Sequence, residues 1–267
     1  MFKTNPDGMR MEPTPERVLS VCRMAARGKI TRESLRDALT FGKNEDKGLN
    51  QEVDRSIDVA LKELGILKMK DGSLELAEPA EVIASARAFR RYVSAKVFYQ
   101  KDTTFFMFSK WLIAQNERLF SLHNWEVMAK TCAAENSELS GLDENAVLGW
   151  RFWASFLGLG YLSRTMFLPN MKLRLQDLLA AEFAQTFRYG ETIRGTDFAF
   201  WLSSRLPEAD ISSRWPLAVS AGLRTLRDLG LIRLETWQDS SRIMLYSVDG
   251  DPNNDFSHIT VYEEVCR

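Results

Sequence analysis

The sequence predicts a mainly α-helical fold with small β-wings, in which tandem winged helix-turn-helix modules are joined by helices. Three observations support this: a repeated phrase, a run of three helices and a hairpin near the start, and a length of 267 residues that suits two or three small modules. In the phrase, a leucine and a glycine close an apolar helix and two apolar residues follow. It occurs at residues 64–67, 159–162 and 229–232. A helix that ends at a glycine and turns into a strand is how a winged module finishes.

Residues 14–78 are expected to form the first winged helix. Thr14 is a hydroxyl N-cap, and the proline and the acid that follow it favour the first turn of a helix. Two further amphipathic helices follow, and Gly65 ends the last of them. The dipeptide Asp71-Gly72 then predicts a two-residue hairpin turn between two short strands. Three helices and one hairpin in so short a segment indicate a winged helix.

The remainder of the chain divides into four further segments. A helical connector is expected first, then a second, degenerate winged-helix-like module, a third winged helix and an acidic C-terminal tail. These segments cover residues 79–122, 123–171, 172–248 and 249–267, in that order. In the third winged helix, stretches at 231–237 and 242–248 are expected to pair as a wing. One last strand is expected within the tail, at 259–263.

Composition limits the classes of partner. The chain has 35 Lys and Arg residues and 36 Asp and Glu residues, so it lacks the strong basic excess that is typical of proteins that bind polyanions. Any affinity for nucleic acid must therefore come from local basic patches. The three cysteines lie far apart without a CxxC pair, which favours a reducing cytoplasm and no disulfide framework. No apolar leader and no run of about 18 uncharged apolar residues is present, so no membrane partner is expected.

No motif for catalysis competes with the winged-helix pattern. Two isolated histidines and three scattered cysteines have no metal-ligand spacing, and no P-loop is present. Gly158-Leu159-Gly160 resembles half of a dinucleotide fingerprint, but it follows a helix rather than a strand. We therefore expect no catalytic residue, no metal and no cofactor, and an enzyme is the least expected class.

An aromatic cluster at residues 150–156 admits two interpretations. It could be a stacking platform for unpaired bases. Its aromatic residues fall on more than one side of the helix, however, and large aromatics dominate cores and interfaces. Burial is the favoured interpretation.

The candidate nucleic-acid contacts lie on the third helix and the wing of two modules. Lysine and arginine supply phosphate contacts, and glutamine and arginine can also read base edges. In the first module the candidates are Lys43, Lys47, Gln51, Arg55, Lys62, Lys68 and Lys70. In the third module they are Arg214, Arg224, Arg227, Arg233 and Arg242. Acidic residues are interleaved with both sets, so ordinary solvated charges are the alternative.

Four short motifs are spread over most of the chain: Pro6-Asp7-Gly8, Pro15-Glu16-Arg17-Val18-Leu19, the segment 149–160 and Leu168-Pro169. Through these motifs the chain resembles the DpdG proteins of bacterial islands that insert 7-deazaguanine derivatives into DNA and restrict DNA lacking them. The resemblance implies a non-catalytic component of an antiviral defence complex. It carries over no site residue.

The first hypothesis for function is therefore a non-enzymatic subunit of a bacterial defence or DNA-processing complex, with duplex DNA as one partner. Other protein subunits, for example an ATPase or a nuclease, would be further partners. The runner-up is a protein-docking scaffold whose winged helices hold partner subunits. A transcription regulator is the third possibility, and it would usually bind as a dimer with one recognition helix per protomer.

Overall fold

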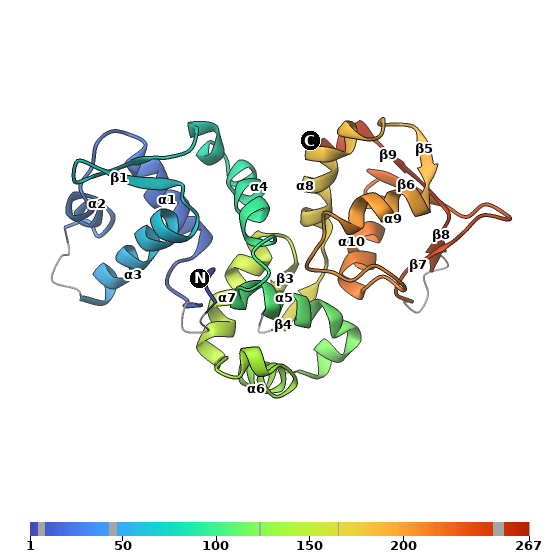
Figure 1. Ribbon diagram of the computed structural model, residues 1–267, viewed down its shortest axis with the longest axis horizontal. Coiled ribbons are helices and arrows are strands. Elements are labelled where there is room, and N and C mark those ends of the chain that lie inside the picture. Colours follow the sequence, from blue (N-terminus) through green and yellow to red (C-terminus); the bar gives the residue numbers. More distant parts are fainter. Residues whose placement is uncertain (5–8, 43–46, 123, 165, 248–253, 267) are drawn as a thin grey trace. The chain divides into compact units, whose positions relative to one another are not determined.

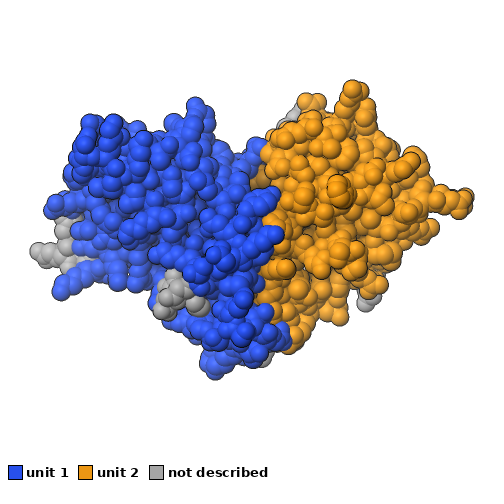
Figure 2. Space-filling model, in the orientation of Figure 1, with its two compact units in different colours: residues 1–107, 125–156 blue, residues 108–124, 157–267 orange. Residues whose placement is uncertain are grey.

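A computed structural model represents the chain, and its described residues are mainly helical with small antiparallel sheets (Figure 1). This confirms the expected fold class at the level of a mainly α protein with short β elements. The described residues are 1–4, 9–42, 47–122, 124–164, 166–247 and 254–266. The chain forms two compact units, coloured separately in Figure 2. Unit 1 comprises residues 1–107 and 125–156, and unit 2 comprises residues 108–124 and 157–267.

Unit 1 begins with three helices in the predicted order. These are α1 (Pro15–Ala25), α2 (Arg32–Leu39) and α3 (Lys47–Asp58), and a π-helical turn, η2 (Val59–Glu63), extends α3. Thr14 caps α1 as predicted, because its hydroxyl accepts a hydrogen bond from the Arg17 amide at 3.4 Å. Thr31 caps α2 in the same way. The apolar residues of each helix face the others, and Leu35 and Ile57 are fully buried.

A small antiparallel sheet follows these helices. The hairpin of β1 (Leu67–Lys70) and β2 (Ser73–Leu76) turns at Asp71 and Gly72, both of which have positive φ, as a type I′ turn requires. The predicted hairpin is therefore confirmed. An isolated bridge joins Ile30, between α1 and α2, to Leu74 in β2. The order across the sheet is thus Ile30, β2, β1.

The rest of unit 1 is helical and buries the aromatic cluster. Its elements are η3 (Ala80–Ile83), α4 (Ala86–Val97), the start of α5 (Thr104–Ala114), α6 (Trp125–Glu135), η5 (Ser137–Leu139) and α7 (Glu144–Phe156). Trp153 of α7 is fully buried, and its indole N–H donates to the Pro13 carbonyl at 2.6 Å. Its ring packs edge-on against Phe2, with centroids 4.9 Å apart. Trp150 is also fully buried, while Phe152 and Phe156 are half-buried, so the favoured interpretation of burial holds for the two tryptophans of the cluster.

Unit 2 combines the end of α5 with the C-terminal half of the chain. Its helices are η4 (Asn116–Ser121), α8 (Lys172–Glu182), η6 (Phe183–Gln185), α9 (Gly195–Ser203), α10 (Leu217–Asp228) and η7 (Glu263–Cys266). Its strands are β3 (Gly160–Ser163), β4 (Met166–Pro169), β5 (Thr192–Arg194), β6 (Ile232–Glu235), β7 (Ile243–Met244), β8 (Asp255–Phe256) and β9 (His258–Val261). The strands β3 and β4 form a hairpin of their own.

The main sheet of unit 2 corrects the expected third wing. The stretches 231–237 and 242–248 do not pair with each other: β6 pairs with β9, and β7 pairs with β8. The sheet order is β5-β9-β6, so the strand expected at 259–263, found at 258–261, is the central one. Of the expected acidic tail at 249–267, the described residues 254–266 contribute β8, β9 and η7 to unit 2. The apolar residues Ile259 and Val261 are fully buried, and this burial ties the end of the chain into the unit.

The two units also cut across two expected segments. The helical connector at 79–122 contributes to both units, and the degenerate module at 123–171 contributes α6 and α7 to unit 1 and the β3–β4 hairpin to unit 2. The limits proposed for the modules therefore stay predictions.

Candidate nucleic-acid interface

The third helix of the first module is buried along one side only. Its buried residues are Val53, Ser56 and Ile57, while Lys47 and Gln51 are exposed. A helix with one apolar stripe presents its remaining surface to solvent or to a ligand. This is the arrangement that a helix needs if it is to enter the major groove.

Two acidic residues of α3, Asp54 and Asp58, form ion pairs with arginines of α2. Arg32 pairs with Asp54 and with Asp58, at 2.9 Å each, and Arg36 pairs with Asp54 at 2.8 Å. Desolvation would raise the pKa of Asp54, but hydrogen bonds from Arg32 and Arg36, together with their charges, outweigh it and hold that pKa below its ordinary value. Lys62 contacts Asp58 at 3.1 Å on the surface of the helix. Asp54 and Asp58, two of the acids that interleave the predicted contacts, therefore pair with arginines of α2 and cancel less of the positive charge of the lysines than the sequence suggests.

Arg55, another predicted contact on α3, is engaged within the protein. Its guanidinium forms an ion pair with Glu12 in the N-terminal arm, the segment that precedes α1, and both side chains are half-buried. Nearby, Arg17 of α1 pairs with Glu52 of α3 at 3.0 Å. These two pairs fasten α3 to the segments before it. Arg55 is therefore a positioning residue for the helix more than a free contact.

The hairpin after α3 carries two exposed lysines on one side. Lys68 and Lys70 are two residues apart on β1, so their side chains point to the same face. Neither these lysines nor Lys47 forms an ion pair with a described residue. Lys43 lies outside the described residues. Three predicted cations of the first module thus remain available to an external anion.

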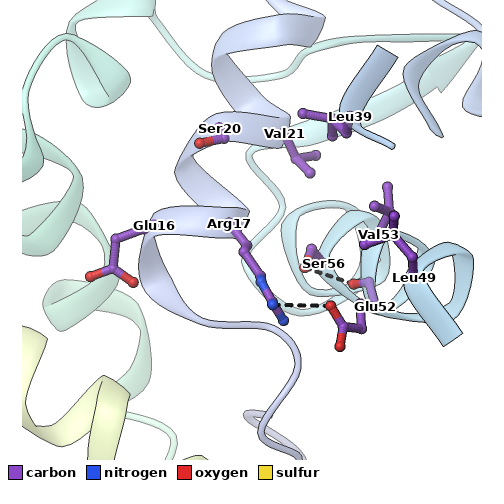
Figure 3. Close-up of a pocket in the computed structure, with 9 residues that line it drawn as sticks. All are labelled: Glu16, Arg17, Ser20, Val21, Leu39, Leu49, Glu52, Val53 and Ser56. Atoms are coloured by element: carbon purple, nitrogen blue, oxygen red, sulfur yellow. Dashed lines mark hydrogen bonds and ion pairs between the residues drawn. The ribbon is translucent and has the colours of Figure 1, made fainter. Parts of the chain in front are cut away.

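A shallow cavity of about 260 Å³ lies between α1, α2 and α3 (Figure 3). Its apolar lining comes from Val21, Leu39, Leu49 and Val53, and the Arg17–Glu52 ion pair stands at its side. No histidine or cysteine lines it. The apolar part of this lining suits an apolar side chain.

The corresponding helix of unit 2 is α10, and in contrast to α3 it is buried on most of its circumference. Seven of its twelve residues are buried: Ala218, Val219, Ser220, Gly222, Leu223, Arg224 and Leu226. At Gly222, an added Cβ would stand 2.9 Å from the Leu175 side chain and 2.9 Å from the Lys172 amide, so α8 lies against this side. Another side is crossed by residues 244–246, where the Tyr246 amide donates to the Ser220 hydroxyl at 2.9 Å. Leu217, Ala221, Thr225 and Arg227 are half-buried and Asp228 alone of the helix is exposed, so α10 offers less open surface than α3.

Arg224, a predicted DNA contact, is buried in the structure. It is only 7% exposed, and its guanidinium donates to the Tyr246 carbonyl at 2.8 Å. The helical spacing of the sequence put Arg224 on the same helix as Arg227, but it could not show that the chain folds back across α10. The role of Arg224 is to hold that crossing segment.

The remaining candidates of the third module are exposed or half-buried, and three of them are paired. Arg227 contacts Asp228 at 2.9 Å, and Arg233 contacts Glu235 at 3.2 Å. The third pair joins Arg242 to Asp255 at 3.2 Å. Arg214, just before α10, is exposed and forms no ion pair with a described residue. Charge on this module is thus largely compensated on the surface.

A polar cluster in unit 2 escaped the sequence reasoning. Arg194 and Thr196, at the junction of β5 and α9, line one cavity together with His258 of β9. They meet because β5 and β9 pair with Arg194 directly opposite His258. The available signal was an arginine and a threonine around the glycine that opens a helix, but the partner strand lies more than sixty residues further along the chain.

Within the described residues, no group of three or more His, Cys, Asp or Glu side chains is placed to hold a metal ion. The helices described there are also too short or too polar to span a bilayer. Comparison of the chain with protein-family models, curated proteins and solved structures gave no match.

Proposed function

We propose that the protein is a non-enzymatic DNA-binding adaptor, which contacts duplex DNA through α3 and the β1–β2 hairpin of its first module. The open side of α3, together with the exposed lysines Lys47 at its start and Lys68 and Lys70 on the hairpin that follows, is the observation that carries this proposal. A helix of this kind can enter the major groove while lysines beside it neutralise phosphates.

The sheet topology supports a winged-helix assignment for both units. In unit 1 the elements run α1, Ile30, α2, α3, β1, β2, and the sheet order is Ile30, β2, β1. In unit 2 the corresponding elements are α8, β5, α9, α10, β6 and β9, with η6 between α8 and β5 and with β7 and β8 between β6 and β9, and the sheet order is β5, β9, β6. The two units therefore repeat one arrangement: helix, strand, two helices and two strands, with the last strand in the middle. A winged helix has this order.

From the burial of α10 we infer different roles for the two modules. In unit 2 the chain between β6 and β9 lies across the third helix, so this module is closed to a major groove. A closed module suits the holding of other subunits, which is the adaptor half of the proposal. The exposed Phe200 on α9, 83% exposed, provides an apolar side chain for such a contact.

The assembly that this adaptor would serve is a bacterial DNA-defence or DNA-processing complex. This part of the proposal rests on the resemblance to the DpdG proteins. Partner subunits with ATPase or nuclease activity would supply the chemistry.

The direct test is the binding of full-length protein to a fluorescently labelled duplex, followed by anisotropy over a range of salt. Counterion release makes the logarithm of the binding constant fall with the logarithm of salt, by about 0.9 for each neutralised phosphate. We expect a slope equivalent to several phosphates and little preference between duplex sequences. Absence of duplex binding even at low salt would contradict the proposal and favour the docking scaffold. Strong preference for one short palindrome, with dimer formation, would favour a regulator.

A further inference from the structure

A second cavity, of about 290 Å³, lies on the polar face of the main sheet of unit 2. Its lining differs from that of the first cavity, because every side chain in it carries a polar group. The lining residues are Arg194, Thr196, Asp239, Ser240, Ser241, Ser257 and His258. They come from the junction of β5 and α9, the loop after β6, and the start of β9.

Strand register brings the basic side chains together. Arg194 and His258 are direct partners in the antiparallel β5–β9 pair, so both side chains stand on one face of the sheet. The next pair along the two strands, Ile193 and Ile259, points to the opposite face of the sheet, where Ile259 is fully buried. Arg194 itself is exposed and forms no ion pair with a described residue. Its charge is therefore available to a ligand in the cavity.

The imidazole ring of His258 is held by a hydrogen bond and a stacking contact, and only one of its two ring nitrogens takes part in that hydrogen bond. The residue is 8% exposed, and its Nδ1 lies 3.0 Å from the Ser257 hydroxyl. The ring is stacked on Trp237, with centroids 3.7 Å apart and planes 23° from parallel. No described residue forms a hydrogen bond with Nε2. A buried, oriented imidazole with an unused nitrogen beside a polar cavity points to an external partner.

The start of α9 completes a site for an anion. Arg194 occupies the N-cap position of this nine-residue helix, and no side chain caps the helix there. The Gly195 amide donates to the Ser257 carbonyl at 2.6 Å, which fixes the helix start against β9. The first N–H groups of a helix lack acceptors within the helix and favour an anion. The Thr196 hydroxyl stands beside them in the cavity lining.

The acidic groups around the cavity restrict the anion. Asp239 lines it, Asp197 is in the first turn of α9, and Glu235 lies opposite His258 on β6, where Arg233 pairs with it at 3.2 Å. Asp239 would repel a bare dianion, but it can accept a hydrogen bond from a hydroxyl group. A phosphate ester that carries a free hydroxyl satisfies both ends. The volume, at the lower limit of about 300 Å³ for ligand sites, suits a phosphate and a sugar.

We propose that this cavity binds a small phosphate monoester with a neighbouring hydroxyl, such as a nucleoside monophosphate, with the phosphate held by Arg194, Thr196 and His258. The site is separate from the α3 surface, so the inference does not depend on DNA binding. A free sugar hydroxyl is absent from the interior of a DNA strand, and Asp239 therefore favours the free ester over backbone phosphate.

Isothermal titration calorimetry on the full chain tests this inference, with AMP, adenosine and inorganic phosphate as the probes. We expect AMP to bind with a Kd of about 1 mM or tighter, and adenosine not to bind. Arg194→Ala should weaken AMP binding about tenfold or more, as expected for loss of a charge-assisted contact. The matched control is Arg214→Ala, an exposed arginine of the same unit that does not line the cavity, and this variant should bind AMP as the unaltered protein does.

Asp239→Asn separates the two ends of the ligand. This variant should bind AMP more weakly, because the acceptor for the hydroxyl group is altered. It should bind inorganic phosphate as tightly as the unaltered protein or more tightly, because a repulsive charge is removed. Failure of AMP to bind, or equal binding by Arg194→Ala, would overturn the inference. If AMP and duplex competed, and Arg194→Ala weakened both equally, the occupant would be backbone phosphate and the assignment to a free ester would be wrong. Duplex binding unaffected by AMP and by Arg194→Ala is the result that supports a separate site.

Discussion

The Arg224 guanidinium donates a hydrogen bond to the Tyr246 carbonyl at 2.8 Å, and through this contact the chain after β6 is fastened across the third helix of unit 2. The Ser220 hydroxyl, which accepts from the Tyr246 amide at 2.9 Å, holds the same residue from the other side. Both hydrogen-bonding groups of one peptide segment are thereby satisfied by α10. The contact explains why α10 is more buried than α3.

Arg224→Ala is therefore expected to destabilise the protein and not to weaken DNA binding directly. Loss of a buried hydrogen bond from a charged group costs about 2 kcal/mol. Urea denaturation followed by circular dichroism measures this loss. The exposed Arg214→Ala is the matched control, and it should stay within about 0.5 kcal/mol of the unaltered protein. Equal stability of the two variants would show that the crossing segment is not held by Arg224.

Gly149→Ala should loosen the N-terminal arm of unit 1. A Cβ at Gly149 would stand 2.5 Å from the Arg10 carbonyl oxygen, which is backbone and cannot swing away. Forcing such a contact costs about 1–3 kcal/mol. Limited proteolysis should then cut near Arg10 faster than in the unaltered protein. Ala146→Gly, on the same helix, controls for a general loss of helix stability; arm cleavage as fast in that variant would refute the close-packing argument.

Thiol reactivity should distinguish the three cysteines. Burial raises the pKa of the Cys22 thiol to about 12, and it also raises that of Cys132 to about 12, although a hydrogen bond from Asn136 opposes the shift. The thiolate is the reactive form, so both should resist alkylation near neutral pH. Cys266 is exposed. With iodoacetamide and mass spectrometry we expect Cys266 to be labelled first and the other two only after unfolding. Rapid native labelling of Cys22 would contradict its burial.

Acid should remove the contribution of the α2–α3 ion pairs. The pKa of Asp54 is lowered in the folded protein, so its charged form stabilises the fold above the unfolded pKa of about 4. This contribution is lost as the pH falls through the lower, folded pKa. Asp54→Asn should therefore be less stable than the unaltered protein near neutral pH and approach it below about pH 4. The exposed turn variant Asp71→Asn is the control, and a gap that persisted in acid would exclude the charge as its cause.

Local chemistry made the first module predictable from the sequence. Thr14 and Asp71-Gly72 each act through their immediate neighbours, so a cap and a tight turn could be assigned without knowledge of the fold. The large aromatic residues of α7 also predicted that this helix is partly buried, because side chains with so much apolar area seldom stay exposed to solvent.

The wing of unit 2 could not be predicted in the same way. Two adjacent alternating stretches suggest a hairpin, and nothing local reveals that β6 instead pairs with β9. The burial of Arg224 has the same origin, since its partner Tyr246 lies far along the chain. Likewise, the pairing of Arg55 with Glu12 depends on where the N-terminal arm packs. Charged residues at helical spacing mark a binding surface only when no other part of the chain packs over that side of the helix.

The salt dependence of duplex binding by two double variants tests the central claim most directly. Lys68→Ala with Lys70→Ala removes the free cations of the β1–β2 hairpin, and Arg233→Ala with Arg242→Ala removes an equal charge from unit 2. The account predicts that the first pair weakens binding and lowers the salt slope by about 1.8, at roughly 0.9 per phosphate, while the second pair leaves the slope unchanged. An unchanged slope for the lysine variant, or an equal loss for the arginine variant, would contradict the assignment of DNA to the first module.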